Sequence, residues 1–166
     1  MAIVHSMNLS NKTQPPTIDQ ALKLRSIISG IVQCCQDRSL FEARTFDLPQ
    51  AELRCLLLFK DQRYLTAKDI CTRMEVGKSR VTKLVDGLLA KKLIDRIDDP
   101  RDGRVKLLSP TRAGQTRLDK IDRFITQVHS RVLAQMEPAQ RALVFASLEQ
   151  LWSAMETVRS ELGIKF

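Results

Sequence analysis

Apolar residues recur at helical spacing along most of this chain. From Thr17 to about Arg44 they stand three or four positions apart, which predicts a long helix, and two similar stretches opened by Thr111 and Pro138 predict two more. The apolar positions are Leu24, Ile27, Ile28, Ile31 and Phe41 in the first helix, Leu118, Ile121, Ile125, Val128 and Val132 in the second, and Leu148, Leu151, Met155, Val158 and Leu162 in the third.

Shorter helices are predicted between the first and second long ones. One follows Pro49, which suits the first turn of a helix. The next is capped by Thr66 and runs to about residue 73, and a third spans about 78–91 after the turn at 75–77. The apolar face of the third consists of Val81, Leu84, Val85 and Leu88.

A β-hairpin follows the third short helix. Residues 93–97 alternate apolar and charged side chains, 98–103 are rich in turn residues, and 104–109 predict a returning strand. Two short helices followed by a hairpin form a unit that places one helix in the major groove of DNA and the hairpin beside it. We therefore expect a mainly α fold with a small β-hairpin wing, namely a winged helix-turn-helix with long N- and C-terminal dimerisation helices.

The predicted organisation has a flexible tail at 1–16, a winged helix-turn-helix DNA-binding domain at 48–114, and a helical dimerisation region formed by 17–47 and 115–166. The apolar faces of the long helices exceed what one small winged helix can cover, so we expect a homodimer. The alternative is that these helices pack on one another within a monomer.

The positive charge is concentrated in the predicted winged helix. The chain carries a net charge of +8, and residues 49–114 hold 15 basic and 9 acidic residues, an excess of 6. Such an excess is typical of a nucleic-acid-binding module, although an inert solvated face has the same composition. On the helix at 78–91, the polar residues gather at the N-terminal half, where the helix dipole favours phosphate. They are Lys78, Ser79, Arg80, Thr82 and Lys83.

The tip of the predicted hairpin carries arginines between acids. An exposed Arg101 suits the narrow minor groove, where the negative potential of DNA is strongest. Asp99 and Asp102 would repel phosphate, so we interpret them as wing-supporting partners of Arg101 or Arg104. A surface turn with internal ion pairs is the alternative interpretation.

The sequence from Leu48 to Gly114 resembles the MarR family of winged-helix regulators. The resemblance is carried by the stretches 81–88, 93–96 and 111–114 and by the wing pattern D-x-R-D-x-R at 99–104. It implies a homodimer that binds a pseudo-palindromic operator, usually as a repressor relieved by a small ligand or by oxidation. It also implies that Ser79, Arg80, Thr82 and Lys83 read the groove, that Arg101 enters the minor groove, and that Arg104 supports the wing or contacts phosphate.

The chain departs from the family pattern at Lys92, where glycine is common. A residue other than glycine in a left-handed helix cap costs roughly 1 kcal/mol, so we expect this helix end to be shaped differently. Oxidation sensing would fall to Cys34 or Cys35, near Arg38, but we expect the cysteines to act mainly as small apolar residues.

Other functional classes find little support in the sequence. We see no nucleophile motif, metal-ligand spacing or phosphate loop, and therefore expect neither an enzyme nor a bound metal or cofactor. The sequence shows no signal peptide and no apolar run that could span a membrane, so we expect a cytoplasmic protein whose partners are double-stranded DNA and a possible small-molecule effector. A winged helix that binds a protein instead of DNA, and a DNA binder without sequence preference, remain alternatives.

Overall fold

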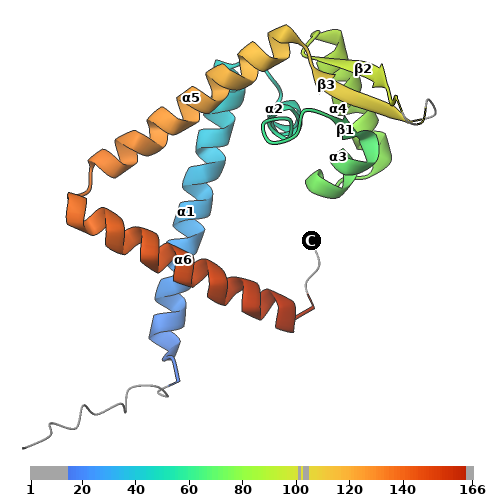
Figure 1. Cartoon of the computed structure of the whole chain (residues 1–166). Coiled ribbons are helices and arrows are strands. Elements are labelled where there is room, and N and C mark those ends of the chain that lie inside the picture. Colours follow the sequence, from blue (N-terminus) through green and yellow to red (C-terminus); the bar gives the residue numbers. More distant parts are fainter. Residues whose placement is uncertain (1–14, 101, 103–104, 164–166) are drawn as a thin grey trace, which may run out of the picture. The chain divides into compact units, whose positions relative to one another are not determined.

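The computed structural model describes residues 15–100, 102 and 105–163. The chain divides into two units, residues 1–42 and 43–166, and α1 (Ile18–Thr45) forms most of the first. The described chain is mainly helical with one small sheet, which confirms the expected fold class (Figure 1). The remaining elements, in chain order, are α2 (Gln50–Leu57), β1 (Leu65–Thr66), α3 (Ala67–Met74), α4 (Lys78–Ala90), β2 (Ile94–Asp98), β3 (Lys106–Pro110), α5 (Arg112–Ala134) and α6 (Pro138–Glu161).

The core of the second unit lies where α2, α3, α4 and the start of α5 meet the sheet. All four apolar residues predicted for α4 are buried, and α3 contributes Ile70 while α2 contributes Leu53 and Leu56. Helices of eight residues are marginal alone, so this burial is what stabilises α2 and α3. Fully burying one such side chain contributes roughly 1.5–3 kcal/mol.

The sheet is antiparallel, with the strand order β1-β3-β2. Both Leu65 of β1 and Arg96 of β2 are register partners of Leu108 in β3. Side chains alternate between the faces of a strand, so Ile94 and Leu108 point to the core while Ile97 and Leu107 point away from it. The predicted returning strand at 104–109 is described from Lys106 to Pro110.

Two helix boundaries differ in detail from the sequence-based expectation. Pro49 precedes α2 as its N-cap and does not lie within the first turn, so the helix begins at Gln50. The end of α4 was expected to change shape because of Lys92, and this expectation is wrong. Lys92 adopts the left-handed conformation with φ 56°. Its N–H donates to the Leu89 carbonyl at 2.8 Å, and the N–H of Leu93 donates to the Leu88 carbonyl at 3.0 Å, which together form a Schellman cap.

We expect Lys92→Gly to stabilise the protein by about 1 kcal/mol, because glycine adopts a positive φ without the steric penalty that lysine incurs. Chemical denaturation monitored by circular dichroism measures the change. Ala90→Gly is the matched control, since Ala90 is the last residue of α4, and glycine there should destabilise. A Lys92→Gly variant no more stable than the wild type would contradict the interpretation.

The start of α5 approaches the end of α4 closely. Thr111 caps α5 by accepting a hydrogen bond from the Gly114 N–H at 2.9 Å, as the sequence predicts. The same threonine donates its hydroxyl to the Lys92 carbonyl at 2.7 Å and its N–H to the Leu93 carbonyl at 3.1 Å. A Cβ on Gly114 would lie 1.8 Å from the Leu93 carbonyl oxygen, so only glycine fits this contact.

Large apolar residues remain exposed on the long helices of the single chain. None of the described residues of α6 is buried, and Trp152 is 69% exposed. The stripe predicted for α5 is buried at Leu118 and Ile121 but exposed at Val132, and Ile27 and Ile31 of α1 are about half exposed. Among the described residues, no helix combines the length and the apolarity that a membrane crossing requires.

Candidate nucleic-acid interface

The N-terminal half of α4 presents an exposed polar face. Its apolar side is buried, and the five polar residues singled out in the sequence are all exposed, namely Lys78, Ser79, Arg80, Thr82 and Lys83. Gly77 is the N-cap, and the first turn of α4 contains no acidic residue. The positive end of the helix dipole and three cationic side chains therefore lie on one accessible surface, which attracts anions.

Thr82 has one hydrogen bond within the helix. Its hydroxyl oxygen lies 3.0 Å from the Lys78 carbonyl oxygen, and since a carbonyl can only accept, the hydroxyl is the donor. The side chain is otherwise exposed on the polar face of α4. Thr82 is thus held by its own helix and oriented outward.

Helix α3, which packs against α4, begins with a side-chain cap. Thr66 and Asp69 form a capping box, in which the Thr66 N–H donates to the Asp69 carboxylate at 2.7 Å and the Asp69 N–H donates to the Thr66 hydroxyl at 3.1 Å. The hydrogen bonds from Thr66 hold the pKa of Asp69 below its usual range. The contribution of this cap to the free energy of unfolding is therefore complete near neutral pH, and it is lost as the pH falls through that lowered pKa.

The turn between α3 and α4 is short and well defined. Glu75 caps α3 in the left-handed conformation with φ 56°, and the N–H of Val76 donates to the Cys71 carbonyl at 3.2 Å. Helix α4 begins three residues after Glu75, and α3, the turn and α4 together form the helix-turn-helix predicted from the sequence. The buried Ile70 and Val81 belong to the same core, so α3 provides a rigid support for the exposed face of α4.

The described part of the wing tip is held by backbone hydrogen bonds. The Asp99 N–H donates to the Val105 carbonyl at 3.1 Å, and the Val105 N–H donates to the Asp102 carbonyl at 2.9 Å. Arg101 and Arg104 lie outside the described residues, so the roles assigned to them, and the support assigned to Asp99 and Asp102, stay predictions from the sequence.

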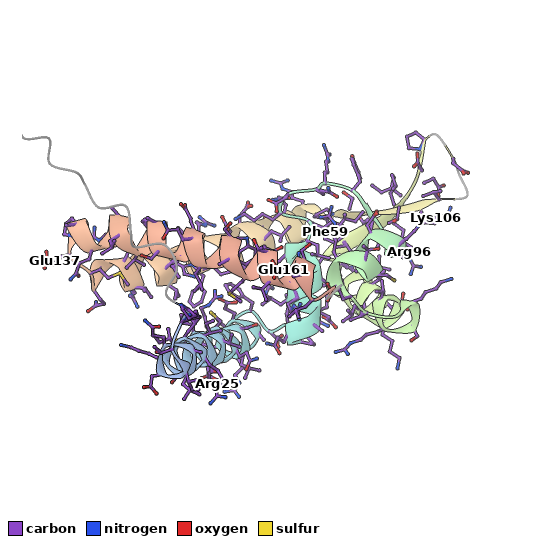
Figure 2. All side chains as sticks on the ribbon, turned by 90° about the horizontal axis from the view of Figure 1, so that it is seen from below. Arg25, Phe59, Arg96, Lys106, Glu137 and Glu161 are labelled. Carbon is purple, nitrogen blue, oxygen red and sulfur yellow. The ribbon has the colours of Figure 1, made fainter. Side chains whose placement is uncertain are left out.

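Two further cations lie beside α4, and neither was among the site residues predicted from the sequence. Arg96 of β2 and Lys106 of β3 line a small cavity of about 90 Å³ together with Thr82 of α4. Figure 2 shows both side chains on the wing strands next to α4. A signal was present, because the period of two places Arg96 on the same sheet face as the buried Ile94, the face that packs against α4.

The cysteines fall into an exposed and a core group. Cys34 and Cys35 are both exposed on α1, and Arg38, one turn later, donates to Glu42 at 2.8 Å. Cys55 is fully buried, and desolvation, followed by the charge of Glu52, raises the pKa of its thiol to about 11. Cys55 is therefore a neutral thiol in the core at physiological pH.

The arrangement defines a class of protein: a winged helix-turn-helix whose exposed helix face is cationic. Comparison with known proteins narrows the class. Residues 46–105 match the model of the MarR family. No curated protein gives a sequence match to the chain.

Solved structures share the fold over nearly their whole length. A MarR family protein from Bacillus stearothermophilus has a TM-score of 0.77 at 15% identity, with 86% of this chain and 99% of that chain covered. YusO from Bacillus subtilis has a TM-score of 0.64 at 27% identity, covering 81% and 99%. A point mutant of S. aureus MepR, bound to an oligodeoxyribonucleotide, has a TM-score of 0.60 at 20% identity, covering 80% and 97%. Residues 46–105 are thus similar to the MarR family, and the chain shares the fold of MarR-family structures.

Proposed function

We propose that this protein is a sequence-specific DNA-binding regulator that acts as a homodimer on a pseudo-palindromic operator. The observation that carries the proposal is the exposed cationic face at the N-terminal end of α4, beside a wing and free of acids in its first turn. This is the part of a winged helix that enters the major groove. The oligodeoxyribonucleotide bound to a mutant of S. aureus MepR, a protein with the same fold, supports DNA as the partner.

Each candidate residue has a proposed role. Arg80 and Lys83 donate to base edges, for which guanine is the preferred acceptor, while Lys78 at the start of α4 contacts phosphate. Ser79 and Thr82 read bases with less discrimination. The assignment of Arg101 to the minor groove, and of Arg104 to the wing or to phosphate, rests on the wing pattern of the sequence alone.

Dimerisation accounts for the uncovered apolar side chains of the long helices. Exposed apolar residues recur along α1, α5 and α6, and large exposed apolar patches normally contact a partner. They include Leu24, Ile27, Ile31 and Phe41 in α1, Val132 in α5, and Leu148, Trp152, Met155 and Val158 in α6. A two-fold dimer would present two α4 helices to successive major grooves on one side of the duplex.

Repression of transcription, and its relief by a small ligand, are proposed from the family resemblance. A cavity of about 500 Å³ lies against the wing and is lined by Tyr64, Ile97 and Leu107 among others.

The test is binding of the full chain to labelled duplex DNA. We expect micromolar or tighter binding to a random duplex of about 30 base pairs at low salt, weakening steeply with added salt because counterions are released. Duplexes enriched from a random library should bind far more tightly and contain inverted half-sites. Sedimentation should show two chains per enriched duplex. A dimer that binds no duplex at low ionic strength would refute the proposal, and equal affinity for all sequences would indicate an architectural DNA binder.

A further inference from the structure

One acidic residue lies on the otherwise cationic face of α4. Asp86 follows Lys83 by three positions and Thr82 by four, so it shares their side of the helix. Its side chain is 57% exposed. A carboxylate at this place repels the phosphates that the rest of the face attracts, and by charge alone it weakens DNA binding.

Asp86 is paired with the wing. Its carboxylate accepts a hydrogen bond from Arg96 of β2, with 2.8 Å between Asp86 Oδ1 and Arg96 Nη2. Arg96, Lys106 and Thr82 line the same cavity of about 90 Å³, so this ion pair connects the helix and the strands at the surface between them. Lys106 in turn pairs with Asp98, its register partner on β2.

Stability is a poor explanation for this pair. Arg96 and Asp86 are each more than half exposed, and an exposed ion pair of this kind contributes little to folding because water and salt screen it. A guanidinium group has five N–H donors, and the bond to Asp86 uses one of its terminal nitrogens. With respect to the described residues, the remaining donors of Arg96 stay available at the edge of the proposed DNA surface.

We propose that Arg96 contacts a backbone phosphate between the groove entered by α4 and the groove approached by the wing, and that Asp86 is the positioning residue that orients its guanidinium. The inference rests on the proposed function. Fixing the guanidinium on Asp86 removes side-chain freedom before DNA binds, so less conformational entropy is lost when the phosphate contact forms. Asp86 thus assists binding although its own charge opposes it.

The two effects of Asp86 predict opposite signs for one substitution. If the carboxylate acts only through its charge, Asp86→Asn removes a repulsion and tightens DNA binding. If it orients Arg96, the same substitution weakens binding about three- to tenfold. Asp95→Asn is the matched control, because Asp95 is an exposed acid on β2 whose side chain lies on the opposite face of the sheet from Arg96. It should bind as tightly as the wild type or more tightly.

The experiment measures the dissociation constant of the full chain, by fluorescence anisotropy, for a labelled random duplex of about 30 base pairs and for an enriched duplex, at several NaCl concentrations. Arg96→Ala should weaken binding to both by about tenfold and reduce the slope of log K against log salt by about 0.9, the value for one lost phosphate contact. Arg96→Lys should recover the slope but only part of the affinity. Asp86→Asn combined with Arg96→Ala should bind no more weakly than Arg96→Ala alone. Thermal denaturation of each variant should match the wild type.

Three results would overturn the inference. If Asp86→Asn binds DNA as tightly as the wild type, the positioning role is refuted. It is also refuted if the loss of affinity in the double variant equals the product of the losses in the two single variants. A weaker Arg96→Ala variant with an unchanged salt slope would refute the phosphate contact. These outcomes presuppose a wild-type protein that binds duplex DNA, whereas a wild type that binds none would overturn the proposed function as well.

Discussion

Gly114→Ala is expected to destabilise the winged helix by about 3 kcal/mol, the upper end of the range for overpacking in a closed site. The added Cβ would lie 1.8 Å from the Leu93 carbonyl oxygen and 2.9 Å from its carbonyl carbon, and both belong to backbone that cannot rotate away. Moving α5 outward would also lengthen the two hydrogen bonds that Thr111 donates to Lys92 and Leu93. Urea denaturation monitored by circular dichroism measures the loss.

Gly77→Ala provides the matched control for that measurement. It is the same substitution in the same domain, but a Cβ at Gly77 meets no atom within 4 Å. Gly77 is the N-cap of α4, where alanine is less favourable than glycine, so a loss of less than about 1 kcal/mol is expected. Equal losses for the two variants would show that the close approach of α5 to Leu93 is not what requires glycine.

Arg80→Ala and Lys83→Ala should each weaken binding to an enriched duplex about five- to 150-fold, since one good base contact contributes roughly 1–3 kcal/mol. The loss on a random duplex should be much smaller, because there the side chains make only sequence-independent contacts. Competition anisotropy with the two duplexes measures both losses in one titration. Neither side chain is buried, so the melting temperature should stay unchanged.

Lys120→Ala is the control for the DNA-binding variants. Lys120 is an exposed cation on α5, outside the winged helix, and its removal lowers the net charge by the same amount. It should leave the ratio of the two affinities unchanged. If Arg80→Ala and Lys83→Ala behave like Lys120→Ala, the assignment of α4 as the recognition helix is wrong.

Local signals were sufficient to predict the elements of the winged helix. Thr66, a favoured N-cap residue, predicts the start of α3, and the structure adds reciprocal hydrogen bonds between Thr66 and Asp69. The spacing of Val81, Leu84, Val85 and Leu88 predicts which side of α4 is buried, and therefore which polar residues are exposed. These features depend on residues within two turns of one another, which a sequence shows directly.

Features that depend on packing between elements were not predicted. The left-handed Lys92 is unfavourable locally, but Leu88 and Leu93, which the cap joins by a hydrogen bond, are both buried in the core, and this packing offsets the cost. The pairing of Asp86 with Arg96 joins residues ten positions apart on a helix and a strand. Strand periodicity indicates the face on which Arg96 lies, but not the residue of α4 that it meets.

The hydrogen bond within α4 restricts which bases Thr82 can contact. Its single hydroxyl proton is committed to the Lys78 carbonyl, so the oxygen offers only lone pairs to a base. In the major groove the complementary groups are the amino groups of cytosine and adenine, whereas guanine and thymine present acceptors that this oxygen does not satisfy. The operator base opposite Thr82 should therefore be cytosine or adenine, which carry an amino group. Valine has the same shape as threonine but no acceptor, so the Thr82→Val variant should lose this preference among bases.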